Sequence, residues 1–173
     1  MTEKMMNKVM LECIRIARQN MDDDQYPIGA IITDDRGKII SSSRSSLRKE
    51  LDPTNHPEIA AIRKASKILK RRKLKKCYLF TTLEPCPMCT SAAIWACMEG
   101  IVYGASQEEA IKFVEEYPEH KLSWRQIPIT ADYIISKSGA KIKLFGGLIE
   151  GGMYVLAFAF VQCIFVIFRR SAE

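Results

Sequence analysis

Two short groups of residues in this chain have the types and spacing of a metal-dependent hydrolytic site. His56 and Glu58 are two positions apart, and Cys86 and Cys89 are separated by two residues. Both groups stand at the predicted start of a helix, where free backbone N–H groups and the helix dipole stabilise thiolates. Two thiolates and one imidazole form a three-ligand zinc site whose fourth position is open to water. Glu58 is then a non-ligand carboxylate that can move protons beside the metal.

Each group has a simpler explanation when it is taken alone. A Cys-x-x-Cys pair also occurs in redox proteins, and a histidine before a helix also serves as a surface cap. The redox explanation needs neither a histidine nor a carboxylate, yet one of the 2 histidines in the chain lies two residues before Glu58. The other, His120, is interpreted as a loop residue. The joint pattern therefore favours one zinc ion held by His56, Cys86 and Cys89, with Glu58 as the catalytic residue.

Alternating helices and strands must position these groups. Apolar residues at helical spacing predict an amphipathic helix over 3–20, and a tight-turn composition between 28–33 and 38–43 predicts a β-hairpin. The polar stretch 44–55 is predicted to be a loop. Further helices are predicted over 57–70, 85–98, 107–117 and 130–139, and further strands over 77–82, 101–104 and 141–145. This order predicts an α/β layered fold.

The composition is typical of one globular domain in a reducing compartment. The 173 residues are 47% hydrophobic and 27% charged, near the averages for soluble domains. The 6 cysteines occur without an apolar signal peptide, which predicts a cytoplasmic protein whose paired cysteines bind metal. The net charge is +6, and its main cluster is Lys70, Arg71, Arg72, Lys73, Lys75 and Lys76. We interpret this cluster as a solvated helix end, with an anionic partner as the alternative.

The joint pattern also carries a family resemblance. His56-Pro57-Glu58, followed after a strand by Pro85-Cys86-Pro87-Met88-Cys89, is the pattern of zinc nucleobase deaminases. Together with their flanks, residues 52–59 and 82–89, these groups resemble the cytidine and deoxycytidylate deaminase superfamily. Within it, the chain is most similar to the branch with guanine deaminase, cytosine deaminase and bacterial tRNA adenosine deaminase. The resemblance runs from Pro27 to about Gly147.

The resemblance implies both a fold and a reaction. The implied fold is a three-layer α/β/α sandwich with a five-stranded mixed sheet. The implied reaction is hydrolytic deamination of a base, with one zinc ion per chain and ammonia leaving after protonation by Glu58. Substrate contacts are expected from Ala30, Ser45, Pro57, Leu83 and Glu84.

Two of these expected contacts depart from the family. The loop asparagine that usually meets the base or sugar is replaced by Ser45 or Ser46, and the usual alanine after the histidine is Pro57, which has no N–H to donate. Because the resemblance to tRNA deaminases fades after Gly104, we expect a free guanine- or cytosine-type base or nucleoside as substrate. The alternatives are a tRNA adenosine deaminase and a zinc-binding but inactive partner subunit.

The chain changes character near its end. Residues 1–150 are predicted to form the zinc-dependent deaminase domain, and residues 151–173 an atypical hydrophobic C-terminal tail. Three explanations of the apolar run 153–168 are ranked: a helix packed on the sheet or on a dimer partner, a membrane tail, or a frameshifted sequence. Sixteen helical residues rise about 24 Å, less than the roughly 30 Å of a membrane core. We therefore expect a homodimer, and membrane association is not favoured.

Overall fold

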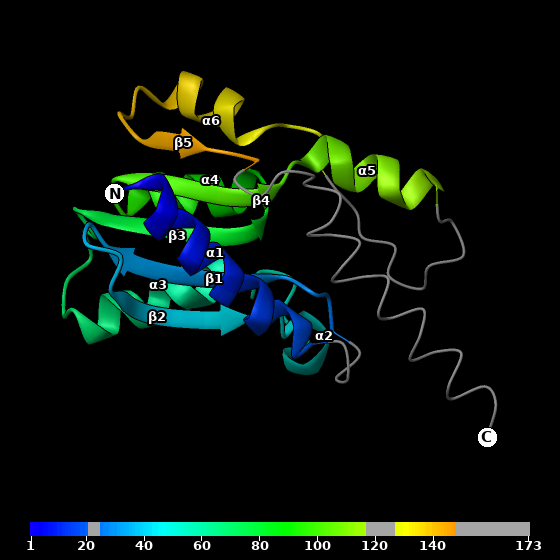
Figure 1. Cartoon of the computed structure of the whole chain (residues 1–173), viewed down its shortest axis with the longest axis horizontal. Coiled ribbons are helices and arrows are strands. Elements are labelled where there is room, and N and C mark those ends of the chain that lie inside the picture. Colours follow the sequence, from blue (N-terminus) through cyan, green and yellow to red (C-terminus); the bar gives the residue numbers. More distant parts are fainter. Residues whose placement is uncertain (21–24, 117–126, 148–173) are drawn as a thin grey trace.

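One five-stranded sheet forms the centre of the computed structural model (Figure 1), which describes residues 1–20, 25–116 and 127–147. The strand order is β2-β1-β3-β4-β5. β1 pairs antiparallel with β2 and with β3, whereas β3, β4 and β5 run parallel. The strands are β1 (Gly29–Asp34), β2 (Ile39–Arg44), β3 (Cys77–Leu83), β4 (Gly100–Ala105) and β5 (Lys143–Phe145). The predicted five-stranded mixed sheet is confirmed.

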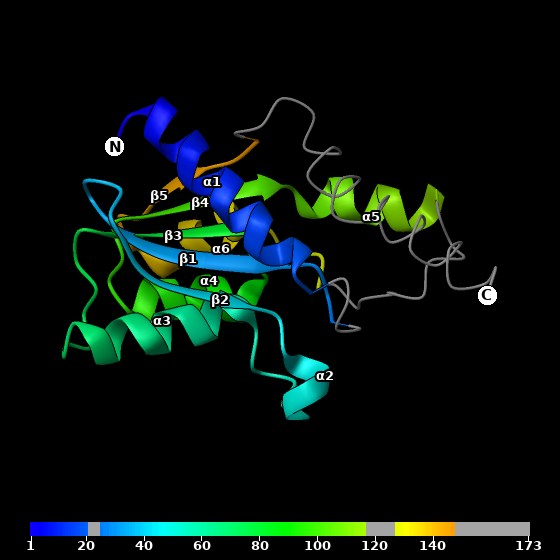
Figure 2. The ribbon, with the colours of Figure 1, turned by 60° about the horizontal axis from the view of Figure 1, so that its bottom comes forward.

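Helices cover both faces of this sheet (Figure 2). Residues alternate between the two faces of a strand, so Ile31 and Phe80 point to the opposite face from Leu79. On the first face, α1 (Glu3–Arg18) buries its apolar stripe against Ile31 and Phe80. On the second face, α3 (Pro57–Ile68) and α4 (Pro87–Trp95) pack on the side that contains Leu79. The three-layer arrangement is therefore confirmed, with β3 buried along its whole length as the central strand.

Two helices end earlier than predicted because the backbone leaves the helical region. α3 ends at Ile68, and Lys70 adopts a left-handed φ of 49°. α4 ends at Trp95 instead of continuing to residue 98, and Cys97 adopts a φ of 53°. A residue in the left-handed region cannot continue a right-handed helix. Periodicity did not reveal these stops because the residues between the observed and the predicted helix ends, 69–70 and 96–98, are compatible with a helix in type.

The stretch predicted to be a loop contains a short helix. α2 (Leu47–Glu50) forms one turn within residues 44–55, and the N–H of Glu50 donates to the carbonyl of Ser46 at 2.9 Å. The prediction of an uninterrupted loop was wrong here because a single helical turn is too short to show apolar periodicity. α2 matters for function because it places Leu47 near the metal centre.

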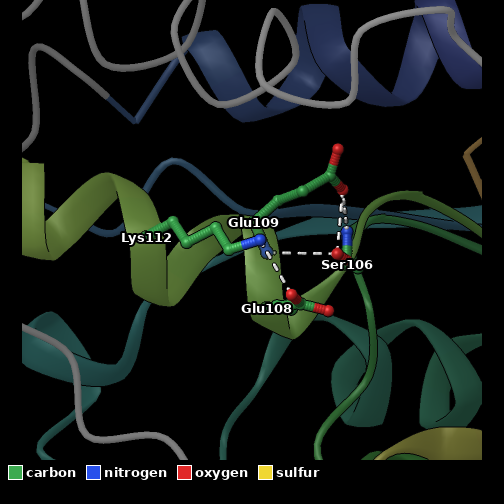
Figure 3. Close-up of polar contacts among 4 residues, drawn as sticks. All are labelled: Ser106, Glu108, Glu109 and Lys112. Atoms are coloured by element: carbon green, nitrogen blue, oxygen red, sulfur yellow. Dashed lines mark hydrogen bonds and ion pairs between the residues drawn. The ribbon is translucent and has the colours of Figure 1, made fainter.

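A capping box sets the start of α5 (Gln107–Glu116), as Figure 3 shows. The Ser106 N–H donates to Glu109 Oε2 at 2.7 Å, and the Glu109 N–H donates to Ser106 Oγ at 3.1 Å. This reciprocal pair satisfies two of the free N–H groups at the helix start. One turn further on, Lys112 forms an ion pair with Glu108 at 2.8 Å. The helix therefore begins at a defined residue, Gln107.

The last described elements are α6 (Ala131–Ser138), which packs on α4, and β5. Thr130 caps α6 through its side chain, and Gly139 ends it with a φ of 67°, as its sequence predicts. The predicted tail, residues 151–173, lies outside the described residues. Within residues 1–20, 25–116 and 127–147, every helix is too short or too polar to cross a membrane.

Candidate metal and catalytic centre

The starts of α3 and α4 meet at one end of the sheet and carry the residues predicted to bind metal. His56 is the N-cap of α3 and Cys86 the N-cap of α4, and both have extended backbone conformations. Neither side chain caps its own helix, so both are available for other contacts. Pro57 and Pro87 occupy the first helical positions, where a missing N–H removes no helical hydrogen bond. Cys89, one turn into α4, is buried beside them.

The three side chains fit a tetrahedral zinc ion. The Nδ1 atom of His56 lies 3.7 Å from Cys86 Sγ and 3.5 Å from Cys89 Sγ. All three ligand atoms lie within 4.8 Å of one another. Zn–S bonds of about 2.3 Å and Zn–N bonds of about 2.0 Å at tetrahedral angles separate such ligands by roughly 3.5 to 3.8 Å. The two nitrogen–sulfur distances match this range, so His56, Cys86 and Cys89, the residues predicted from their spacing, are placed to hold zinc.

The electrostatics of the three side chains also suit a cation. Hydrogen bonds with Cys89 and with His56 together lower the pKa of Cys86 to about 4, against the effect of burial. The same hydrogen bond to Cys86, together with burial and the nearby Glu58 charge, raises the pKa of Cys89. The contact with Cys86 raises the pKa of His56. Cys86 is therefore the thiolate of the pair, and a bound metal would take the place of the proton that Cys89 otherwise keeps.

Glu58 lies at the centre of this site, in the first turn of α3. Its side chain is 4% exposed, and Thr81 donates to its Oε1 atom at 2.8 Å. The Cys89 thiol lies 3.5 Å from the other oxygen, Oε2. Burial raises the pKa of Glu58, although the His56 charge and the Thr81 hydrogen bond oppose this effect. A carboxyl with a raised pKa, held beside a metal site, is suited to accept and return a proton.

Thr81 is a site residue that motif analysis missed. It lies in β3 on the same face as Leu79, the face that α3 and α4 cover. A hydroxyl on a buried face needs a hydrogen-bond partner, which here is Glu58. Strand alternation along the predicted strand 77–82 already places Thr81 on the same face as Leu79.

A cavity of about 170 Å³ opens next to the centre. Three predicted substrate residues, Pro57, Leu83 and Glu84, lie in its wall together with the centre itself. Its full lining is Tyr26, Ile28, Leu47, His56, Pro57, Glu58, Leu83, Glu84, Cys86, Gln107 and Ile127. Tyr26, Ile28, Leu47, Gln107 and Ile127 come from loops and helix starts that carry no motif, so sequence reasoning did not find them.

Two other predicted substrate residues lie away from this cavity wall. Ala30 is fully buried in β1, where it pairs with Thr81. Ser45 is 1% exposed and belongs to a neighbouring cavity of about 600 Å³, with Ser46. Asn55 donates to Ser46 Oγ at 2.9 Å, so the loop that carries these serines is tied to the segment before His56. A substrate contact from Ala30 or Ser45 stays a prediction.

Glu84 joins the cavity to two later helices. Its Oε2 atom accepts from the N–H of Gln107 at 3.0 Å, and its Oε1 atom accepts from the N–H of Ala131 at 2.8 Å. These N–H groups open α5 and α6. Gln107 in turn donates from Nε2 to the carbonyl of Ile129 at 3.1 Å. With both carboxylate oxygens bonded to backbone, Glu84 holds the cavity wall together.

Replacing Glu84 by Ala is expected to lower the free energy of unfolding by about 2 to 4 kcal/mol, because two buried N–H groups lose a charged acceptor. Urea denaturation measures the loss, and zinc content measured in parallel reports on the metal site. Glu84→Gln is the matched control, since its amide keeps one acceptor, and it should lose less than Glu84→Ala. Equal stability of Glu84→Ala and the unmodified protein would contradict this role.

Comparisons with known proteins agree with this geometry. Residues 3–105 match the family model described as the cytidine and deoxycytidylate deaminase zinc-binding region. A tRNA(Ile)-lysidine synthase of Deinococcus deserti is 34% identical over 138 residues, which cover 80% of this chain but 26% of that protein. The chain thus spans about a quarter of the length of this relative. A probable cytosine deaminase of Schizosaccharomyces pombe is 33% identical over 135 residues, covering 76% of this chain and 82% of that protein.

A solved structure shares the fold of this chain. It comes from a study of A-to-I editing by tRNA:A34 deaminases, with a TM-score of 0.68 and 26% sequence identity. The match covers 88% of this chain and 99% of that chain. The family model spans the helix starts that carry His56, Cys86 and Cys89. The chain belongs to the family defined by the cytidine and deoxycytidylate deaminase zinc-binding region, and its metal is zinc.

Proposed function

We propose that this chain is a zinc-dependent hydrolytic deaminase that releases ammonia from a guanine- or cytosine-type nucleobase or nucleoside. The observation that carries the proposal is the position of Glu58, a buried carboxylate that contacts Cys89 but is not needed as a ligand. Burying a carboxylate costs free energy because the charge loses its water. An inactive zinc-binding subunit would gain nothing in return for burying Glu58 at this point.

The roles of the residues follow from their contacts. Zinc held by His56, Cys86 and Cys89 would act as a Lewis acid that makes water nucleophilic near neutral pH. Glu58 would take a proton from the attacking water and deliver it to the departing amine. Thr81 would hold the Glu58 carboxylate in place through its 2.8 Å hydrogen bond.

The volume of the cavity supports a substrate of which no more than one base lies inside the cavity. Its volume of about 170 Å³ lies below the roughly 300 Å³ at which sites for drug-sized ligands begin. A sugar would therefore extend toward the cavity mouth. Tyr26, Ile28, Leu47 and Leu83 give the cavity the apolar surface on which a flat ring packs.

A tRNA adenosine deaminase is the second candidate. It is favoured by the solved structure from tRNA:A34 deaminases, nearly all of which this chain covers. An anticodon substrate would call for basic side chains around the cavity. The main basic cluster, residues 70–76, lies at the start of β3, whereas the cavity wall contains Leu83 and Glu84 at the other end of this strand. This cluster therefore gives the tRNA function no support at the active site.

One ammonia-release assay tests the proposal. The zinc-loaded protein is incubated with guanine, cytosine, adenine, their nucleosides and a tRNA anticodon stem-loop. We expect release from a free base or nucleoside. Activity on the stem-loop alone would favour the second candidate, and no activity on any substrate would favour an inactive zinc-binding subunit.

Replacing Pro57 by Ala is expected to lower KM for guanine or cytosine up to about tenfold while kcat and zinc content stay unchanged. Alanine at this position regains a backbone N–H at the cavity wall, and one hydrogen bond contributes roughly 0.5–1.5 kcal/mol. Adenine-type substrates serve as the control, because they lack the carbonyl oxygen that would accept from this N–H. An unchanged KM across the panel would mean that Pro57 serves only the helix start.

We also propose that the protein is a homodimer, with the end of α4 at its interface. Trp95 is 78% exposed at the end of α4, and Ile68 is 60% exposed at the end of α3. Exposed apolar side chains of this size favour association, and a second copy of the chain would remove them from water. Trp95→Asp is expected to shift the mass measured by sedimentation from dimer to monomer, with Leu11→Asp on α1 as the control. A monomeric unmodified protein would refute the dimer.

A cytoplasmic location is part of the same proposal. The described cysteines Cys13, Cys77, Cys86, Cys89 and Cys97 all carry free thiols, which is the usual state in a reducing compartment. Fractionation of cells that express the full chain tests this location.

A further inference from the structure

An exposed basic loop lies at the end of the sheet opposite the metal centre. The loop, residues 69–76, joins α3 to β3, and the metal-binding cysteines follow the other end of β3. A strand of this length spans roughly 20 Å. Figure 1 shows the α3–β3 connection at the left and the start of α4 toward the opposite side. The basic side chains of the loop are Lys70, Arg71, Arg72, Lys73, Lys75 and Lys76, all of them exposed.

A solvated helix end explains only part of this loop. The favourable interaction of cations with a helix dipole is confined to the last turn. α3 ends at Ile68, and the N–H groups of Lys70 and Arg71 close it by donating to the carbonyls of Lys67 and Ser66. Lys73, Lys75 and Lys76 lie beyond that turn, so the helix dipole does not account for them.

The backbone of the loop does not call for lysine either. Lys70 has a φ of 49° and Lys76 a φ of 61°, both in the left-handed region that favours glycine or asparagine. Lysine at these positions therefore adds a positive charge against the local backbone preference.

The loop is held in one conformation by a buried anchor. Leu74 is fully buried, and its N–H donates to the carbonyl of Ala96 at 2.6 Å. Arg71 Nη2 donates to the carbonyl of Lys75 at 3.2 Å and so ties the two sides of the loop together. The cations consequently stand on a fixed frame, which reduces the entropy lost when they bind a partner.

Acidic groups nearby offset only part of this charge, because the six cations of the loop face two aspartates, Asp34 and Asp35, on the β1–β2 turn. Asp34 accepts from the backbone N–H groups of Arg36 and Lys38, and Glu99 pairs with Lys143 at 2.9 Å. Asp35 is a further carboxylate on the β1–β2 turn. Among the described residues, the cations of the basic loop form no ion pair. The loop therefore presents a concentrated positive potential to solvent.

We propose that the basic loop binds the phosphate backbone of a nucleic acid, at a surface separate from the catalytic cavity. Several cations on a rigid frame match the repeated charges of a phosphate backbone. An anionic membrane is the less suitable partner, because the one large apolar side chain between Lys70 and Lys76, Leu74, is buried and cannot insert into lipid. The surface does not depend on which base the enzyme deaminates.

Fluorescence anisotropy with a labelled RNA duplex tests this surface. The variant carries Lys73→Gln, Lys75→Gln and Lys76→Gln. The control carries Lys8→Gln, Lys49→Gln and Lys112→Gln, which remove the same charge from α1, α2 and α5. Each phosphate contact contributes about fivefold to affinity at about 0.15 M salt, so the variant should bind roughly a hundredfold more weakly. Its slope of log affinity against log salt should be smaller by about 3.

The outcomes separate this proposal from its alternatives. Weaker binding by the loop variant, with the control unchanged, supports the surface. Equal weakening of both variants, no RNA binding by the unmodified protein, or tighter binding to phosphatidylserine vesicles than to RNA would overturn it. Zinc content and ammonia release are measured on the same samples. Because the loop lies outside the cavity, both should be unchanged in the variant, and a failure of the deaminase proposal would leave the RNA result standing.

Discussion

Replacing Glu58 by Gln is expected to lower kcat by roughly 10²- to 10⁴-fold while one zinc ion per chain is retained. The amide keeps the shape of the carboxylate and its hydrogen bond from Thr81, but it cannot carry a proton. The residues that could hold the metal are His56, Cys86 and Cys89, so the substitution removes none of them. Ammonia release with the substrate found in the panel, and metal analysis of the same sample, provide the two measurements.

Thr81→Val is the matched comparison for this variant. Valine has the shape of threonine but no hydroxyl, so the Glu58 carboxyl keeps its chemistry and loses one hydrogen bond. We expect a decrease in kcat of up to about tenfold, the effect of one hydrogen bond, with KM little changed. If Glu58→Gln released ammonia at the rate of the unmodified enzyme, Glu58 would have no part in the mechanism.

Replacing Cys89 by Ala is expected to remove zinc from the protein, and Cys86→Ala should have the same effect. Either change leaves two ligands where three are required, and the Cys89 position is buried, so an exposed side chain cannot easily take its place. Loss of the metal also removes its stabilisation of the folded state, so Tm should fall by several degrees. Metal analysis and thermal unfolding measure these effects.

Cys97→Ala is the control for the cysteine variants, because Cys97 is exposed and its thiol is free. It should retain one zinc ion per chain and the Tm of the unmodified protein. Stoichiometric zinc in both Cys86→Ala and Cys89→Ala would show that this cysteine pair does not bind the metal. A parallel titration with a chelator should lower the Tm of the unmodified protein and of Cys97→Ala alike.

The metal site was predictable because its residues stand next to strong local signals. Pro57 and Pro87 mark helix starts, and the ligands flank them at fixed spacing, so types and positions together specify the chemistry. The cavity wall was less predictable. Tyr26, Leu47 and Gln107 approach the site from three separate parts of the chain, and none lies in a motif.

The family resemblance singled out Glu84 as a residue of the substrate site, but it did not predict the hydrogen bonds that Glu84 accepts. Both of its oxygens bind backbone N–H groups more than 20 residues away, an arrangement that depends on how α5 and α6 pack. The same limit applies to the basic loop. Its charge is plain in the sequence, yet only the direction of β3 places it away from the cavity. The sequence shows how many positive charges the loop carries, whereas the direction of β3 decides which end of the sheet they occupy.

The proline that opens each ligand-bearing helix has a consequence for metal exchange. Pro57 and Pro87 restrict φ in the unfolded chain as well as in the fold, so the two helix starts need little reorganisation to receive an ion. A frame of this kind should accept cobalt(II) in the same mixed nitrogen and sulfur environment, since such ligands at tetrahedral positions suit several divalent ions. Changes in the visible absorption of the cobalt form would then report ligand binding in the cavity, without an assay of turnover.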